Sequence, residues 1–209
     1  MTRFPDRRAA GLRLGEQLSR REWHEPVVLG IARGGVVVAQ AVAEVLHAPW
    51  EVVVARKIGA PGHPEFGVGA VTASGDTVYE GHALRALGLT PEALRETRGA
   101  EQAEARRREN VYLGGRNPLA CGGCDVLLVD DGLATGVTAR AAARSIRREG
   151  PRRLVFAAPV TAKDADAGEV DEVISVVQPA NFRAVGEWYA DFRPTSDDEV
   201  LALLGVTVR

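Results

Sequence analysis

Lysine and cysteine are scarce in this chain of 209 residues. Of its 26 basic residues only Lys57 and Lys163 are lysines, and in so arginine-rich a background a retained lysine hints that its compact ammonium matters. The two cysteines share one motif, Cys121-Gly122-Gly123-Cys124. No second Cys or His pair exists to complete a tetrahedral zinc site, and the motif precedes a strand rather than a helix, where a reactive thiolate is usually stabilised. We interpret it as a loop with two thiols and leave its role open.

Long apolar runs and a charge excess are also missing. No stretch approaches the ~20 apolar residues of a membrane span, and the first residues lack the apolar core of a signal peptide. The net charge is -2, so bulk charge gives no sign of nucleic-acid or membrane binding. These features predict a soluble cytoplasmic protein, and the length fits a single α/β domain over residues 1–209.

The most informative segment runs from Val126 to Thr138. Four apolar residues, Val126 to Val129, end at the adjacent carboxylates Asp130 and Asp131, and small residues and two threonines follow before apolar residues return at helical spacing. This pattern predicts a buried strand, a tight loop and a helix start. Free backbone amides at such a junction bind phosphate, and the two acids suit another part of the same ligand, such as sugar hydroxyls or Mg²⁺.

These residues resemble the signature of the type I phosphoribosyltransferases, which bind phosphoribosyl pyrophosphate (PRPP). The resemblance implies that Asp130 and Asp131 meet the ribose as catalytic residues and also bind Mg²⁺. It further implies that the loop holds the 5′-phosphate by amides and hydroxyls; the residues concerned are Gly132, Leu133, Ala134, Thr135, Gly136, Val137 and Thr138. The alternative is an ordinary Asp-Asp-Gly turn with Thr135 as a helix cap.

Three further elements complete a site of this family. By resemblance, Arg33, Gly34 and Gly35 form the pyrophosphate loop, with a cis or strained peptide. Arg56 and Lys57 stabilise the charge of the leaving pyrophosphate and lead into a mobile Gly/Pro-rich lid. The tail, residues 179–209, forms a hood in which Phe182, Trp188 and Tyr189 are candidates to bind the acceptor and Asp191 is a third candidate metal ligand. Each element also has a purely structural alternative. The glycine loop is then a tight turn before a helix, Arg56 and Lys57 are two surface charges, and the aromatic residues of the tail only form its core.

Ala134 stands where members acting on 6-oxopurines carry an acid, which argues against hypoxanthine or guanine. The resemblance therefore predicts Mg²⁺-dependent transfer of a phosphoribosyl group from PRPP to a nucleobase or related amine. Members of this family are commonly dimers or larger, so a homo-oligomer, such as a dimer, is also expected. A second hypothesis is a PRPP-sensing regulator without transferase activity. A PRPP synthase would need a second such domain and an ATP site, for which the chain has no room.

The predicted fold is α/β, a parallel β-sheet flanked by helices, with the strand before Asp130 at its centre. Its core covers about 27–80 and 119–178, with a helical insertion at about 83–116 and a hood joined by an N-terminal helix, 6–21. Strands are predicted at 27–31, 50–55, 126–129, 154–158 and 173–177, a hairpin at 68–79, a loop at 56–67 and short helices at 163–167 and after Ser196. A charged helix from Thr90 to Asn110 is predicted to face solvent or a partner. Its Arg106-Arg107-Arg108 run fits a solvated face, with contact to a ligand phosphate or a neighbouring subunit as the alternative.

Overall fold

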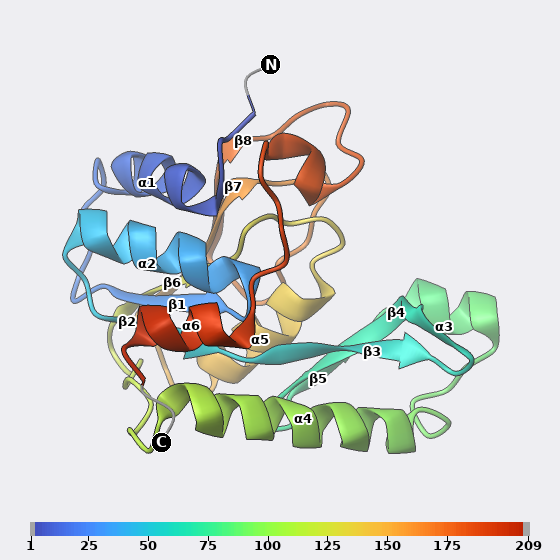
Figure 1. Cartoon of the computed structure of the whole chain (residues 1–209). Helices are drawn as coiled ribbons and strands as arrows, with labels where there is room; N and C mark the ends of the chain where they lie inside the picture. The colour runs from blue at the N-terminus through green and yellow to red at the C-terminus, as the bar shows by residue number, and fades with distance from the viewer. Residues whose placement is uncertain (1–2, 207–209) are drawn as a thin grey trace.

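The structure, a computed structural model, describes residues 3–206, apart from the side chain of Pro64. A five-stranded parallel sheet with the order β2-β1-β6-β7-β8 forms its centre (Figure 1). The strands are β1 (Val27–Ile31), β2 (Trp50–Val53), β6 (Asp125–Val129), β7 (Arg153–Val160) and β8 (Glu172–Val177). The prediction that the strand before Asp130 is central is confirmed, because β6 lies between β1 and β7.

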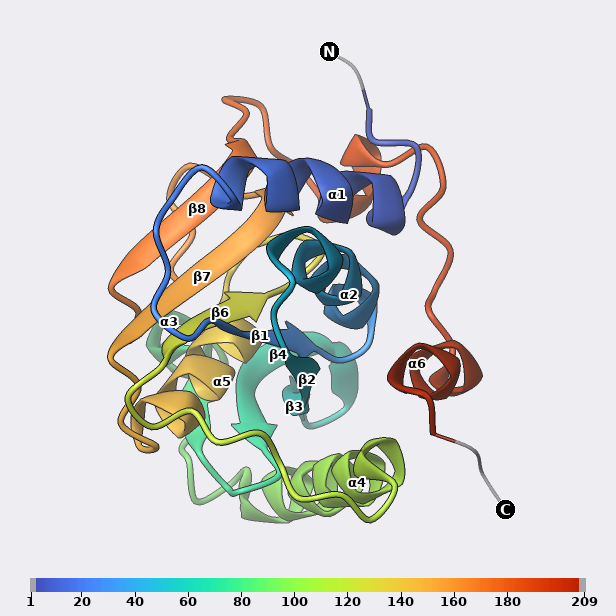
Figure 2. The same cartoon turned by 90° about the vertical axis from the view of Figure 1, so that its left-hand side faces the viewer.

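Helices cover both faces of this sheet. Helices α1 (Arg7–Leu18) and α2 (Gly34–Leu46) lie on one face, and α5 (Val137–Arg147) lies on the other (Figure 2). Both faces of the inner strands are apolar: alternate residues of β6 pack with α5, and the remainder pack under α1 and α2. A continuous apolar run at Val126–Val129 follows from burial on both sides. Asp6 caps α1 by accepting a bond from the amide of Ala9 at 2.7 Å, as the sequence suggests.

A second sheet forms an arm that extends from this centre (Figure 1). It contains β3 (Ala55–Ala60), β4 (His63–Thr72) and β5 (Thr77–Tyr79), all antiparallel, with α3 (Gly81–Leu87) at its end. The predicted hairpin at 68–79 is confirmed, but the loop predicted at 56–67 is wrong. Pro61 and Gly62 make a tight turn there, with Gly62 at φ 75°, and the strands on either side satisfy each other's backbone. The Pro-Gly pair was the available turn signal.

Helix α4 (Arg95–Leu113) runs along the arm, and α6 (Asp197–Leu204) contacts both α2 and α4 (Figures 1 and 2). Helix α4 begins later than predicted, because residues 91–94 form turns and Thr90 caps only those turns through the amide of Ala93. The short helix predicted at 163–167 is wrong, since that segment also forms turns. The last helix is confirmed with its capping box, in which Ser196 and Glu199 bond each other's backbone. None of the helices within residues 3–206 is long and apolar enough to span a bilayer.

Candidate functional site

The acid pair lies at the carboxyl edge of the parallel sheet, where β6 ends. The first turn of α2 packs directly against it. A Cβ on Gly34 would lie 2.1 Å from Oδ2 of Asp131, and a Cβ on Gly35 would lie 2.9 Å from Oδ1 of Asp130. Neither glycine therefore has room for a side chain, and the glycine pair and the acid pair form one unit. Ligands of open α/β sheets bind at this edge.

Burial and mutual repulsion make it unfavourable for the two carboxyl groups to be ionised together. Burial raises the pKa of Asp130 well above its usual range, and the neighbouring charge of Asp131 raises it further. Burial also raises the pKa of Asp131, although Arg7 opposes this shift. The amide of Asp131 donates to Oδ1 of Asp130 at 2.8 Å. Paired carboxyl groups with raised pKa values, held at a sheet edge, are typical of functional sites rather than of a plain turn.

Arg7 is the residue of this site that sequence reasoning missed. Its Nε donates to Oδ2 of Asp131 at 2.8 Å, and both side chains are more than four-fifths buried. The guanidinium also stacks over the ring of Phe192, 4.0 Å from its centroid, and donates to the carbonyl of Arg193 at 2.7 Å. Arg7 thus ties the acid pair to the tail. No local motif marks a partner 124 positions away in the chain.

The loop between β6 and α5 presents free amides. Leu133 is buried and anchors it, donating to the carbonyl of Val160 at 3.0 Å and accepting from the amide of Ala162 at 2.8 Å. Beyond it, Ala134 and Thr135 are exposed. No acceptor within residues 3–206 pairs with the amides from Ala134 to Thr138, which include the first turn of α5. Free amides at the start of a helix form an anion site.

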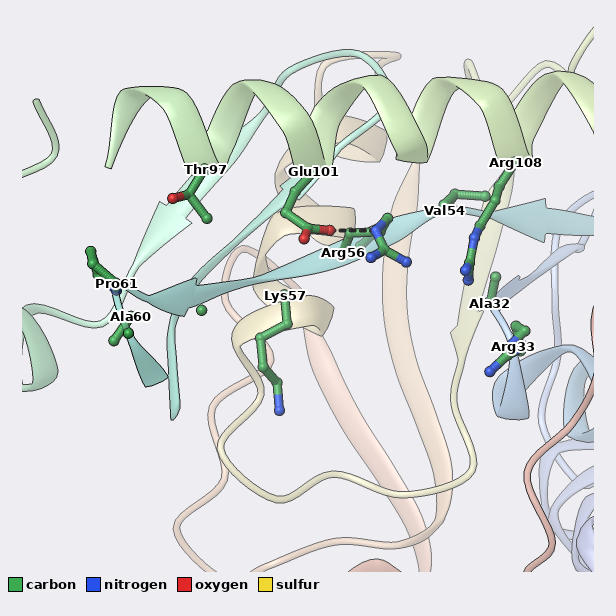
Figure 3. A pocket seen from close by; sticks show the side chains of 13 residues that line it. Ala32, Arg33, Val54, Arg56, Lys57, Ala60, Pro61, Thr97, Glu101 and Arg108 are labelled. Carbon is green, nitrogen blue, oxygen red and sulfur yellow. Dashed lines mark hydrogen bonds and ion pairs between the residues drawn. The ribbon is translucent and has the colours of Figure 1, made fainter. Parts of the chain in front are cut away.

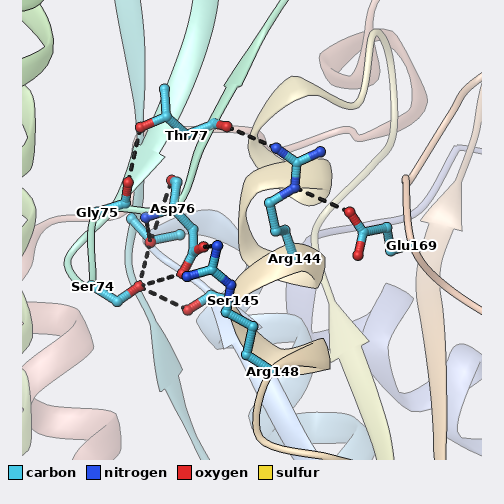
Figure 4. A network of polar contacts seen from close by, with 9 residues as sticks. Ser74, Gly75, Asp76, Thr77, Arg144, Ser145, Arg148 and Glu169 are labelled. Carbon is cyan, nitrogen blue, oxygen red and sulfur yellow. Dashed lines mark hydrogen bonds and ion pairs between the residues drawn. The ribbon is translucent and has the colours of Figure 1, made fainter.

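A cleft of about 560 Å³ is lined by Ala32 and Arg33, the residues that come directly before the glycine pair in the chain (Figure 3). The peptide between Ala32 and Arg33, which lines it, is cis, as the resemblance implied. Arg33, Arg56 and Lys57 all line this cleft. They do not act alike: the pleat of β3 places Arg56 and Lys57 on opposite sides of the strand (Figure 3). Arg56 donates to Glu101 of α4 at 2.5 Å, whereas Lys57 is exposed.

The tail carries the candidate acceptor residues. Phe182 and Trp188 are half-buried, and the indole N–H of Trp188 has no acceptor among the residues described. Tyr189 is different: it is 3% exposed, its ring packs between Phe4 and Phe192, and its hydroxyl donates to the carbonyl of Asp131 at 2.5 Å. This burial makes Tyr189 a support for the acid pair and leaves no ring face for a base.

Asp191, the third candidate metal ligand, is paired with a nearby arginine. Its carboxylate accepts bonds from the amide and the guanidinium of Arg193, two residues away. Within residues 3–206 no group of three or more potential ligands is arranged to enclose a metal ion. A metal site made by Asp130, Asp131 and Asp191 together therefore stays a prediction, and in this structure Asp191 is paired with Arg193.

The Cys121 and Cys124 thiols are both unbridged. Cys121 is buried, and burial, followed by the charge of Glu149, raises its pKa to about 12. A thiol with so high a pKa is a weak nucleophile. The motif therefore behaves as part of the turn before β6, and it takes no part in the site described above.

A parallel sheet, an acid pair at its central strand and a loop of free amides define an α/β protein with a candidate site for a phosphorylated ligand at one edge of the sheet. Comparison with known families supports this class. Residues 5–193 match the model of the phosphoribosyl transferase domain, and the chain belongs to that family. The predicted fold, an α/β sheet flanked by helices, is confirmed with it.

Two relatives are similar along nearly the whole chain. One, from Mycobacterium tuberculosis H37Rv, is provisionally named a phosphoribosyl transferase; it is 40% identical over 207 residues, which are 98% of this chain and 47% of the relative. This chain thus spans about half the length of that relative. The crystal structure of TT1426 from Thermus thermophilus is 42% identical, with a TM-score of 0.80 and coverage of 97% of this chain and 98% of that one. A hypothetical protein from Neisseria gonorrhoeae shares the fold at 15% identity, with a TM-score of 0.54 and coverage of 98% and 95%.

Proposed function

We propose that this protein binds PRPP and transfers its phosphoribosyl group to a nitrogen nucleophile, releasing pyrophosphate. The observation that supports this most is the placement of three different chemistries around one sheet edge. The free amides from Ala134 to Thr138 suit the 5′-phosphate, the carboxylates of Asp130 and Asp131 suit the ribose, and the cationic cleft that begins at Arg33 suits the pyrophosphate.

The residues have distinct roles in this proposal. The carboxylates accept hydrogen bonds from the ribose hydroxyls and stabilise positive charge as the anomeric carbon becomes oxocarbenium-like. Arg33 and Lys57 stabilise the negative charge that grows on the departing pyrophosphate. Trp188 and Phe182 offer half-buried aromatic surface to a flat acceptor. The resemblance also implies a homo-oligomer, which sedimentation of the purified protein would test.

The acid pair fits Mg²⁺ as a partial site. Among residues 3–206, Oδ1 of Asp130 is bonded only to the neighbouring amide, and the pair supplies two hard oxygen ligands. Mg²⁺ is commonly held by one or two carboxylates together with substrate phosphates rather than by an all-protein cage. When bound with the substrate, the ion would neutralise and orient the pyrophosphate. Asp130 and Asp131 are the residues that would hold it.

Titration calorimetry with PRPP and Mg²⁺, followed by a pyrophosphate-release assay with a panel of bases and amines, tests the proposal. The wild type should bind PRPP, and at least one acceptor should support turnover. Asp131→Asn should weaken PRPP binding or turnover by about 100-fold, since charged hydrogen bonds contribute about 1.5–3 kcal/mol each. Asp191→Asn, outside the acid pair, is the matched control and should behave like wild type. Absence of PRPP binding would overturn the proposal. PRPP binding without turnover would favour the second hypothesis, a PRPP-sensing regulator.

A further inference from the structure

One face of helix α4 points inward, although nearly half of its residues are charged. Glu101, Ala105, Arg108 and Tyr112 follow one another at spacings of three or four residues, so they share that face. Ala105 and Tyr112 are fully buried, and the hydroxyl of Tyr112 donates to Asp197 of α6. Arg108 lies between these two buried positions. The prediction that this helix faces solvent or a partner misses this inward face, which packs against the rest of the protein.

The three consecutive arginines of α4 have three different surroundings. Arg106 donates to the carbonyl of Ala73 at 2.8 Å, which holds the helix against the arm. The side chain of Arg107 is 58% exposed and pairs with Glu104 on the helix surface. The side chain of Arg108 is 21% exposed, and its guanidinium extends from α4 toward Ala32 and Arg33 in the cleft (Figure 3).

Two guanidinium groups therefore line the same end of the cleft. Each is held by a carboxylate that does not line it: Arg108 pairs with Glu104 at 2.8 Å, and Arg33 lies 3.7 Å from Asp197. An arginine has five N–H donors, so each retains donors for a ligand. Guanidinium groups match phosphate oxygens in geometry as well as in charge.

The remaining charges of the cleft strengthen the case for an anion at this end. Arg56 is neutralised within the cleft by Glu101, the one carboxylate among its described lining residues, and Lys57 extends from the other side of β3. Arg33 and Arg108 face the same space, and the two carboxylates that pair with them, Glu104 and Asp197, do not line it. Like charges gathered in this way are stabilised when an anion binds between them.

We propose that Arg108 and Arg33 together bind the terminal phosphate of the pyrophosphate group, so that helix α4 is part of the substrate site. This inference rests on the proposed function and adds a binding residue to it. The chain order supports the placement, because Arg33 is followed at once by the two glycines that touch the acid pair. The cleft therefore starts where the ribose site ends.

Calorimetry on the whole protein with three ligands tests the role of Arg108. The ligands are PRPP, inorganic pyrophosphate and ribose 5-phosphate, each with Mg²⁺, and the proteins are wild type, Arg108→Gln, Arg108→Lys and Arg107→Gln. Arg108→Gln should weaken PRPP and pyrophosphate binding about 10- to 100-fold, the value of lost charge-assisted hydrogen bonds. It should leave ribose 5-phosphate binding unchanged, since that ligand uses the acid pair and the loop.

The control variants make the result specific. Arg107→Gln removes the same charge from the same helix and the same Glu104 partner, and it should match wild type for all three ligands. Arg108→Lys keeps the positive charge but loses the planar set of guanidinium donors, so its affinity for PRPP and pyrophosphate should lie between those of wild type and Arg108→Gln. Urea unfolding of each variant reports whether the fold is intact.

The outcomes separate this inference from the proposed function. Equal binding of all three ligands by wild type and Arg108→Gln would overturn the role of Arg108 and leave the function standing. An equal loss of ribose 5-phosphate binding would also overturn it, because the damage would then be general. Wild type that binds pyrophosphate but not PRPP would overturn the function alone, and wild type that binds neither would overturn both.

Discussion

Replacing Gly35 by alanine should destabilise this protein, although alanine favours helices. A Cβ at this position would lie 2.7 Å from the carbonyl oxygen of Val129 and 2.9 Å from Cα of Asp130. Both atoms belong to the backbone at the end of the central strand, so they cannot rotate away as the tip of a side chain can. Either α2 or the end of β6 must shift.

The size of the effect follows from two opposing contributions. Overpacking of a close-packed site typically costs about 1–3 kcal/mol. Alanine in place of glycine in a helix returns up to about 1 kcal/mol. Because the added Cβ meets backbone atoms, the cost lies in the upper part of the overpacking range, about 2–3 kcal/mol. The free energy of unfolding of Gly35→Ala should therefore fall by about 1–3 kcal/mol, which for a chain of this size lowers Tm by roughly 2–12 °C.

Gly99→Ala is the matched control. Gly99 lies within α4, is exposed, and would find no atom within 4 Å of an added Cβ. The same chemical change should there raise the free energy of unfolding by about 0.5–1 kcal/mol. Urea unfolding followed by circular dichroism measures both variants, and calorimetry with PRPP should show weakened binding for Gly35→Ala alone. Equal stability of Gly35→Ala and wild type, or shifts of the same sign in both variants, would refute the steric reasoning.

Three more predictions concern buried polar groups. The raised pKa of Asp130 makes its ionisation costly in the folded state, so Asp130→Asn should be more stable than ligand-free wild type at pH 7. This gain in stability should shrink as the pH falls from the raised pKa toward the ordinary value of 3.8. Urea unfolding across that pH range measures the gain, and a gain that does not change with pH would contradict the prediction. Burial would raise the pKa of Asp125, but the hydrogen bonds from Arg152 and from the amide of His24, together with the charges of Arg152 and Arg153, outweigh it and lower that pKa. Asp125 therefore stabilises the fold above about pH 3.8, and the difference between wild type and Asp125→Asn should vanish as acid is added below that value. Tyr189→Phe should cost about 1 kcal/mol of stability and weaken PRPP binding, because the bond to the carbonyl of Asp131 is lost; unchanged Tm and affinity would rule out the supporting role.

Features that depend on near neighbours could be predicted from the sequence. Four apolar residues ending at Asp130 and Asp131 required a buried strand that opens at a sheet edge, and β6 occupies the centre of the sheet. The small residues after the acids required a loop before a helix, and α5 begins there. Capping of α1 by Asp6 and of α6 by Ser196 follows from bonds that span three residues.

Contacts between distant parts of the chain could not be predicted in this way. The pairing of Arg7 with Asp131 joins positions 124 residues apart. The strands within 56–67 were missed because a Gly/Pro-rich segment has weak strand propensity by itself, and pairing between β3 and β4 overrides that propensity. Burial of Tyr189 against Phe4 depends on the N-terminal segment packing beside the tail.

The sequence by itself thus determined which residues form the acid pair and the loop of free amides, since both are set by short-range spacing along one strand, loop and helix. Only the tertiary structure decided what surrounds them: Arg7 behind Asp131, the glycine pair in contact with both acids, and Arg108 in the cleft. The physical reason is that a local pattern fixes the face on which a side chain lies, whereas its partner is fixed by how separate elements pack.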